Sequence, residues 1–319
     1  MSENTDGDAT ALRVHAVLHC NLNTVDIAAS ETFYNTTFDH TTKMTSLGNG
    51  TDVTPMGLTE PATSDTRFLW DARGPRSAPS FELVDWQHPA VIPAPDHKVL
   101  GYIAAGFRVP SLDTIAGRLD SAGRTTEKGD VTLRGHSRRA LTGHDAEGIG
   151  FEIVEVPPGS DEPQTTLFSH LRARCANLSA TIAWYRDIGF EVVAGESHGE
   201  SVSLALPEDP TFSIEFEQAD VDAAQIAAHQ CLPANTQGLY RIALAVDDVW
   251  ASRNALADKY AAIPEPAHIS MEDIPTGGFT ILFLRDPDGT MVELVERPRS
   301  AVRRPQAPEQ TYVPRVSTS

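Results

Sequence analysis

The sequence predicts an α+β fold built from four repeated units, in each of which a strand and a helix precede two or three further strands. Three observations predict this fold. A short pattern with a glutamate between apolar residues occurs four times, a strand-like segment precedes each copy, and a segment with helical periodicity follows each of these opening strands. With 319 residues, the chain is long enough for two domains that each bury a core.

The glutamate pattern is expected to mark the last strand of each unit. It reads SFELVDW, GFEIVEV, FSIEFEQ and MVELVER, and its glutamates are Glu82, Glu152, Glu215 and Glu293. Side chains alternate along a strand, so Glu293 shares a face with Met291 and Val295, and the other face is also apolar. A carboxylate in such surroundings is costly unless it has a partner. Either the strand lies at a wet edge, or Glu293 binds a metal ion or an arginine.

The opening strands are expected at residues 14–22, 102–109, 167–175 and 239–246. Two of them align closely through the helix that follows, because His19 precedes Tyr34 by fifteen residues and His170 precedes Tyr185 by fifteen. The equivalent position holds Ala104 in the second unit and Arg241 in the fourth. The two histidines are therefore matched candidates for one function, which the other two units lack.

Composition limits the partners. A net charge of −19 and a pI near 4.9 would repel nucleic acid and anionic membranes, so a small-molecule partner is expected. No apolar run has the length of a membrane span, and the acidic start MSENTDGDAT lacks the features of a secretory signal, so a cytoplasmic location is expected. The three cysteines lack metal-type spacing. A monomer or homodimer is expected.

Stretches rich in proline and glycine suggest the boundaries of the units. They predict a disordered N-terminus (1–11) and a first domain (12–156) with units 12–86 and 97–156. A linker (157–165) then leads to a second domain (166–298) with units 166–218 and 236–298, and a flexible tail (299–319) follows.

Two motifs resemble the vicinal oxygen chelate superfamily, which includes glyoxalase I, extradiol dioxygenases and bleomycin-resistance proteins. They are the closing segment RDPDGTMVELVE and the opening segment HCNLNTVDIAASETFY. The resemblance extends from about Arg13 to Pro298. It implies four βαβββ modules that form two glyoxalase-like half-barrel domains, each around one site.

The resemblance also implies one divalent metal ion per site, which would be Fe, Mn, Co, Ni or Zn. Family ligands come from the opening and closing strands, so the implied ligands are His19, Glu82, Glu152, His170, Glu215 and Glu293. If modules pair in chain order, Glu152 joins His19 and Glu82; if outer and inner modules pair, Glu293 joins them. The second and fourth modules offer only their glutamates, because Ala104 and Arg241 occupy their opening positions.

Four arginines on the opening strands are expected to bind a ligand: Arg108, Arg172, Arg174 and Arg241. With Glu152 and Glu293 as catalytic proton carriers, the favoured function is a metal-dependent isomerase, epimerase or lyase acting on a small oxygenated metabolite. One alternative is an extradiol-type dioxygenase, which requires a second histidine at the metal. The other is a metal-free protein that binds an antibiotic-like molecule, with Arg241 paired to Glu293.

Overall fold

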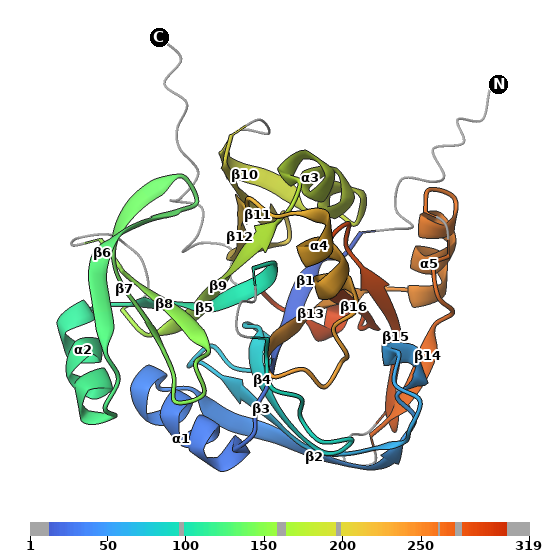
Figure 1. Ribbon diagram of the computed structural model, residues 1–319, viewed down its shortest axis with the longest axis horizontal. Coiled ribbons are helices and arrows are strands. Elements are labelled where there is room, and N and C mark those ends of the chain that lie inside the picture. The colour runs from blue at the N-terminus through green and yellow to red at the C-terminus, as the bar shows by residue number, and fades with distance from the viewer. Residues whose placement is uncertain are drawn as a thin grey trace.

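The computed structural model describes residues 13–95, 99–157, 164–195, 199–260, 262–271 and 276–304. Within them, four βαβββ modules follow one another, which confirms the α+β prediction (Figure 1). Module one contains β1 (Ala16–Asn23), α1 (Ile27–Phe38), β2 (Thr41–Thr51), β3 (Ala62–Trp70) and β4 (Ser80–His88). Module two contains β5 (Gly101–Val109), α2 (Leu112–Ser121), β6 (Thr126–Leu133), β7 (His136–His144) and β8 (Gly150–Glu155).

Modules three and four repeat this order. Module three contains β9 (Leu167–Cys175), α3 (Leu178–Asp187), β10 (Glu191–Gly195), β11 (Ser201–Leu206) and β12 (Asp209–Gln218). Module four contains β13 (Gly238–Val246), α5 (Val249–Ala257), β14 (Ala267–Ser270), β15 (Gly278–Arg285) and β16 (Met291–Glu296). The helix α4 (Ala223–Gln230) connects these two modules, and 3-10 turns occur at η1 (Thr54–Met56) and η2 (Arg299–Ala301).

The modules pair as an outer and an inner couple. One sheet, here the outer sheet, has the order β14-β15-β16-β13-β1-β4-β3-β2; the inner sheet has the order β10-β11-β12-β9-β5-β8-β7-β6. Figure 1 shows the blue β1 beside the orange β13. The predicted division into domains 12–156 and 166–298 does not describe these sheets, because each sheet takes one module from either half. Module three lies directly beside module two, because β9 pairs with β5 in the antiparallel direction.

Inside every module the opening strand runs parallel to the closing strand with the same register. The residue two positions after each candidate opening residue lies opposite the closing glutamate: Asn21 opposite Glu82, Gly106 opposite Glu152, Arg172 opposite Glu215, and Ala243 opposite Glu293. The structure therefore confirms that the four glutamates occupy equivalent positions. It also makes Ala104 and Arg241 the structural counterparts of His19 and His170.

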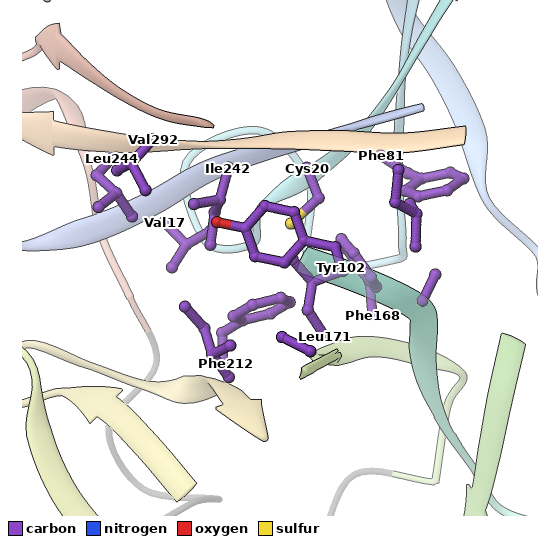
Figure 2. Close-up of a cluster of buried hydrophobic side chains, with 14 of the residues drawn as sticks. Val17, Cys20, Phe81, Tyr102, Phe168, Leu171, Phe212, Ile242, Leu244 and Val292 are labelled. Atoms are coloured by element: carbon purple, nitrogen blue, oxygen red, sulfur yellow. The ribbon is translucent and has the colours of Figure 1, made fainter. Parts of the chain in front are cut away.

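One hydrophobic core lies between the two sheets. Figure 2 shows its side chains arriving from both, with Cys20 and Ile242 from the outer sheet and Phe168, Leu171 and Phe212 from the inner sheet. Because side chains alternate along a strand, the neighbours of these residues point to the opposite face of their sheet. The core therefore determines which face of each sheet carries the histidines and glutamates.

Short polar motifs begin the module helices. The side chains of Asp26, Ser111, Asn177 and Asp248 each accept a hydrogen bond from the backbone N–H three residues later, at the start of α1, α2, α3 and α5. Such N-caps satisfy backbone donors that the first helical turn leaves unpaired. Among the described helices, none has the length and apolar character needed to cross a membrane.

Aspartates in the turns before the closing strands fasten the modules to one another. In the DPDG turn, Asp286 accepts hydrogen bonds from the backbone of Asp288 (3.0 Å) and Thr290 (2.9 Å), while Gly289 adopts φ 92°. The equivalent Asp145 accepts a hydrogen bond of 3.0 Å from the hydroxyl of Tyr34 in module one. The DPDG turn also contacts module three, because Asp288 accepts a hydrogen bond of 2.9 Å from the backbone N–H of Ala176.

Candidate functional site

The centre of the outer sheet brings together four charged or ionisable side chains from four strands. His19 lies on β1, Glu82 on β4, Arg241 on β13 and Glu293 on β16. One strand neighbour of each belongs to the core between the sheets, namely Cys20, Phe81, Ile242 and Val292, so these four side chains point to the sheet's other face. This outer-sheet cluster unites His19, Glu82 and Glu293, as the pairing of outer modules implied, and Arg241 occupies the fourth position.

Arg241 bridges the two glutamates of this cluster. Its Nε donates to Oε2 of Glu293 at 2.8 Å, and its Nη2 donates to Oε2 and Oε1 of Glu82 at 2.9 and 3.1 Å. His19 Nε2 lies 3.4 Å from Oε2 of Glu82 and 3.5 Å from Oε2 of Glu293, beyond the usual hydrogen-bond distance. The guanidinium and the imidazole therefore approach the same two carboxylate oxygens, and the guanidinium binds them.

The charges of the cluster stabilise one another in a buried place. Burial acts to raise the pKa of Glu293, but the Arg241 guanidinium and then His19 outweigh it and hold the pKa at about 2. Burial acts to lower the pKa of Arg241, and the two carboxylates reverse this and raise it. Near neutral pH Glu293 is therefore a carboxylate paired with the charged guanidinium of Arg241.

Several buried polar atoms near the cluster have no hydrogen-bond partner among the described residues. They are His19 Nε2, Arg241 Nη1, and both the nitrogen and the oxygen of the Asn21 side-chain amide. Asn21 follows His19 by two residues and lies opposite Glu82, so it belongs to the same face of β1. Buried polar groups in native proteins are bound by protein, water or ligand. This arrangement offers donors and an acceptor to a bound molecule.

Apolar and aromatic side chains surround the outer-sheet cluster. Phe68 packs edge-on against the His19 ring with centroids 5.6 Å apart, and Trp70 stacks beside Phe68. The opposite side of the face is lined by Ala243, Phe283 and Met291 among other buried residues. Hollows of about 250 and 270 Å³ beside α2 share no residue with this face. The polar atoms thus lie at the centre of an apolar surface.

Part of the donor set has the spacing that a divalent ion requires. Zinc bonds of about 2.0–2.2 Å in a tetrahedron place neighbouring donors about 3.4 Å apart, and His19 Nε2 lies 3.4 and 3.5 Å from the two Oε2 atoms. The fourth position, however, holds the guanidinium of Arg241, which has no lone pair to donate and is positively charged. As it stands, this set does not fit a divalent ion. In the described ranges, no group of three His, Cys, Asp or Glu residues is arranged as a metal site.

The inner sheet carries the equivalent cluster, in which the protein itself satisfies the polar atoms. His170 Nε2 lies 2.9 Å from Oε1 of Glu152, and its Nδ1 lies 2.9 Å from the Ser169 hydroxyl. Arg172 donates to both oxygens of Glu152. Burial acts to raise the pKa of Glu152, but His170 and then Arg172 outweigh it and hold the pKa at about 2. This inner-sheet cluster also includes Glu215.

Close packing leaves little room in the inner-sheet cluster. Glu215 accepts hydrogen bonds from the hydroxyls of Ser213, at 2.6 Å, and Ser203. A Cβ atom at Gly106 would lie 2.2 Å from His170 Nε2, so the ring fills the space that the glycine leaves. Ala104, in the fourth position, offers no donor side chain. The inner-sheet cluster therefore does not fit a metal ion either, and the metal-ligand assignments in both sheets stay predictions.

Two predicted ligand-binding arginines remain, Arg174 and Arg108. Arg174 is exposed, and its Nε lies 3.9 Å from Oε2 of Glu217. Arg108 is buried, with an exposed fraction of 2%. Their roles in ligand binding stay predictions.

Sequence reasoning did not single out Asn21 or Gly106. Asn21 could have been found, because strand alternation places it on the face of His19. The role of Gly106 depends on its position opposite His170 in the neighbouring strand, and only the sheet topology supplies that.

Comparison with known proteins agrees with this architecture. Residues 167–294 match the sequence profile of the Glyoxalase/Bleomycin resistance protein/Dioxygenase superfamily. Glyoxalase I from Zea mays superposes with a TM-score of 0.62 and 17% identity, covering 89% of this chain and 92% of that one. A candidate dioxygenase from Bacillus subtilis subsp. subtilis str. 168 superposes with a TM-score of 0.62 and 13% identity, covering 89% and 86%.

At these identities the superpositions describe the fold alone. No curated protein matches the chain. The profile match comprises modules three and four, and the shared fold extends over all four modules. Modules three and four therefore match the Glyoxalase/Bleomycin resistance protein/Dioxygenase superfamily, and the chain shares its overall fold with glyoxalase I from Zea mays.

Proposed function

We propose that the outer-sheet cluster binds a small oxygenated molecule and that Arg241, in the place of a metal ion, holds the oxygen of that molecule. One observation carries the proposal. Arg241 pairs with both Glu82 and Glu293, yet its Nη1 remains without a described partner, as does the amide of Asn21. The two glutamates orient the guanidinium, and Nη1 donates to the ligand.

The surroundings specify the class of ligand. The aromatic and aliphatic wall favours a molecule with an apolar body, and Arg241, Asn21 and His19 favour hydroxyl or carbonyl oxygens on one side of it. The guanidinium of Arg241 already pairs with Glu293 and Glu82, so a carboxylate ligand would bring a third acidic group to one arginine. A neutral oxygenated molecule therefore suits the cluster better than a carboxylate.

A proton-transfer enzyme is the second candidate, because His19 Nε2 has no described partner and lies 3.4 Å from the Glu82 oxygen that the guanidinium of Arg241 binds. His19 could exchange a proton with a carbon next to the bound carbonyl while Arg241 stabilises the enolate oxygen. This would give an isomerase, epimerase or lyase that uses no metal-bound step. The dioxygenase alternative requires a second histidine, and the equivalent positions hold Arg241 and Ala104.

A thermal-shift panel tests the proposal in metal-free buffer. Neutral probes such as catechol, a naphthoquinone and a hydroxyketone are compared with mandelate as a carboxylate of similar size. We expect at least one neutral probe to raise the midpoint temperature of the wild-type protein at millimolar concentration. Asn21→Leu and Arg241→Lys are expected to abolish that shift.

Arg172→Lys supplies the matched control, because Arg172 is a buried arginine paired with a glutamate in the inner sheet. The shift should persist in this variant. If the shift disappears in Arg172→Lys and persists in Arg241→Lys, the inner sheet holds the site and the proposal fails. Absence of any shift across an extended neutral panel also contradicts it.

A further inference from the structure

We infer that Arg76 and Arg297, at the end of the outer sheet where β16 ends and β4 begins, bind the phosphate group of a small molecule. The inference goes beyond the proposed function, because this place is separate from the outer-sheet cluster. Arg297 follows Glu293 by four residues, about 13 Å along an extended chain. Three features carry the inference: the arginines that follow β16, the support of the Arg297 side chain, and the closeness of like charges.

Arginines are concentrated in the segment that follows β16, although the chain as a whole has a net charge of −19. The segment reads RPRSAVRR and contains four arginines. Two of them attach the segment to the protein, since Arg299 pairs with Glu208 at 2.8 Å and also with Asp247, and Arg304 pairs with Asp209 at 2.8 Å. The attachment thus accounts for these two arginines and leaves Arg297 unexplained.

The side chain of Arg297 has a rigid support but no acidic partner. The register of β15 and β16 sets Ile281 opposite Val295, so Phe279 lies across from Arg297. The guanidinium carbon of Arg297 lies 5.8 Å from the centre of the Phe279 ring. Among the described residues, no carboxylate pairs with Arg297. Stacking on an aromatic ring orients the planar guanidinium, and its N–H donors stay available to a ligand.

Two further arginines lie close to Arg297. Burial, and then the charges of Arg304 and Arg76, lower the pKa of Arg297. Arg76, in the loop between β3 and β4, donates from Nη2 to the carbonyl of Ser300 at 2.8 Å. Its own carbonyl accepts hydrogen bonds from the backbone N–H of Arg303 at 2.7 Å and from Nη1 of Arg304 at 3.0 Å. The loop and the segment are therefore fastened together and hold like charges near one another, which favours a bound anion.

The charge and the number of donors favour a phosphate group over a carboxylate. The planar fork of one arginine satisfies a carboxylate, whereas a phosphate dianion offers three acceptor oxygens and a charge near −2 to two arginines. Arg304 is compensated by Asp209, so Arg76 and Arg297 supply two positive charges without a carboxylate partner in the described part of the chain. The acidic chain would repel a long polyanion such as nucleic acid. A small molecule with one phosphate group fits both observations.

Anion titration of the full-length protein tests the inference. Inorganic phosphate, phenyl phosphate and benzoate are each added to a chloride buffer at constant ionic strength, while thermal shift and phosphorus NMR line width are measured. We expect a saturable rise in midpoint temperature with both phosphates at millimolar concentration, and little change with benzoate. Arg297→Gln and Arg76→Gln should each weaken phosphate binding by about tenfold or more.

Arg124→Gln supplies the matched control. Arg124 also has no carboxylate partner among the described residues, and it lies just after α2 in module two. Phosphate binding should persist in this variant. Phosphate also stabilises proteins in general because it is excluded from their surface, but that effect does not saturate and would be equal in every variant.

Four results overturn the inference. They are the absence of saturable binding, equal binding by wild type and the two site variants, equal binding of benzoate, and binding of inorganic phosphate without phenyl phosphate, which would assign the place to the free ion. Arg76 is exposed, so Arg76→Gln decides the question if Arg297→Gln does not fold.

Discussion

Replacement of Arg241 by methionine isolates the electrostatic role of the guanidinium. Methionine keeps an unbranched apolar chain but removes the three contacts of 2.8, 2.9 and 3.1 Å to Glu293 and Glu82. Removal of one partner from a buried ion pair costs about 3–5 kcal/mol, because the remaining charge stays buried without compensation. We expect a loss of this size in the free energy of unfolding at pH 7, measured by urea denaturation with a chelator present.

The pH dependence of this variant should reverse in sign. In the wild type the folded pKa of Glu293, about 2, lies below its ordinary value of 4.5, so its contribution is complete above about pH 4.5 and is lost as pH falls towards 2. Without Arg241, burial should raise the folded pKa of Glu293 above its ordinary value of 4.5. Stability of Arg241→Met should then increase as pH falls through the raised pKa towards 4.5.

Two further variants complete this test. Arg253→Met removes an arginine from a more exposed pair, and we expect a change within about 1 kcal/mol. The triple variant Glu82→Gln, Arg241→Met, Glu293→Gln removes all the charges and should recover most of the lost stability. A loss below about 1 kcal/mol in Arg241→Met, with an unchanged pH slope, would refute the role given to the guanidinium.

Three other predictions follow from the same contacts. Gly106→Ala should destabilise the protein by about 1–3 kcal/mol in urea denaturation, because its Cβ would meet His170. Gly117→Ala is the control and should stabilise the protein slightly, because its Cβ would lie in open space on α2. Equal effects of the two substitutions would contradict the packing argument. Wild-type stability should fall by about 3 kcal/mol between pH 4.5 and 2 from Glu293 alone, and Glu293→Gln should show a shallower slope in the same titration. Tyr34→Phe removes the hydrogen bond to Asp145 and should lower the free energy of unfolding by about 1.5–3 kcal/mol. A denaturation curve that coincides with that of the wild type would contradict this prediction.

Much of the fold could be predicted from the sequence because its signals are local and repeated. The four glutamates follow the period of a strand, and the polar N-caps precede segments with helical periodicity. The predicted modules therefore agree closely with β1, β5, β9 and β13 as opening strands. The pairing of modules was not predictable, since it depends on which edges of the opening strands meet after folding.

The candidate site was predictable in part for the same reason. The repeated pattern identified His19 and Glu82 as the candidate residues of the first module, on its opening and closing strands. The structure shows Glu293 beside them. Only part of the role of Arg241 could be predicted, because its two partners differ in their separation from it along the sequence. Its pairing with Glu293 lies within one module, whereas its pairing with Glu82 joins residues 159 positions apart. Only the sheet topology brings that second carboxylate to the guanidinium.

The most direct test of ligand binding through Arg241 without a metal ion is a calorimetric titration. The probe is the compound that gives the largest thermal shift, and the titration is done with and without Zn²⁺ in wild type, Arg241→Lys and Arg172→Lys. The account predicts equal affinity in both buffers for the wild type, a loss of about tenfold or more in Arg241→Lys, and no loss in Arg172→Lys. Binding by the wild type only when a divalent ion is present would contradict it.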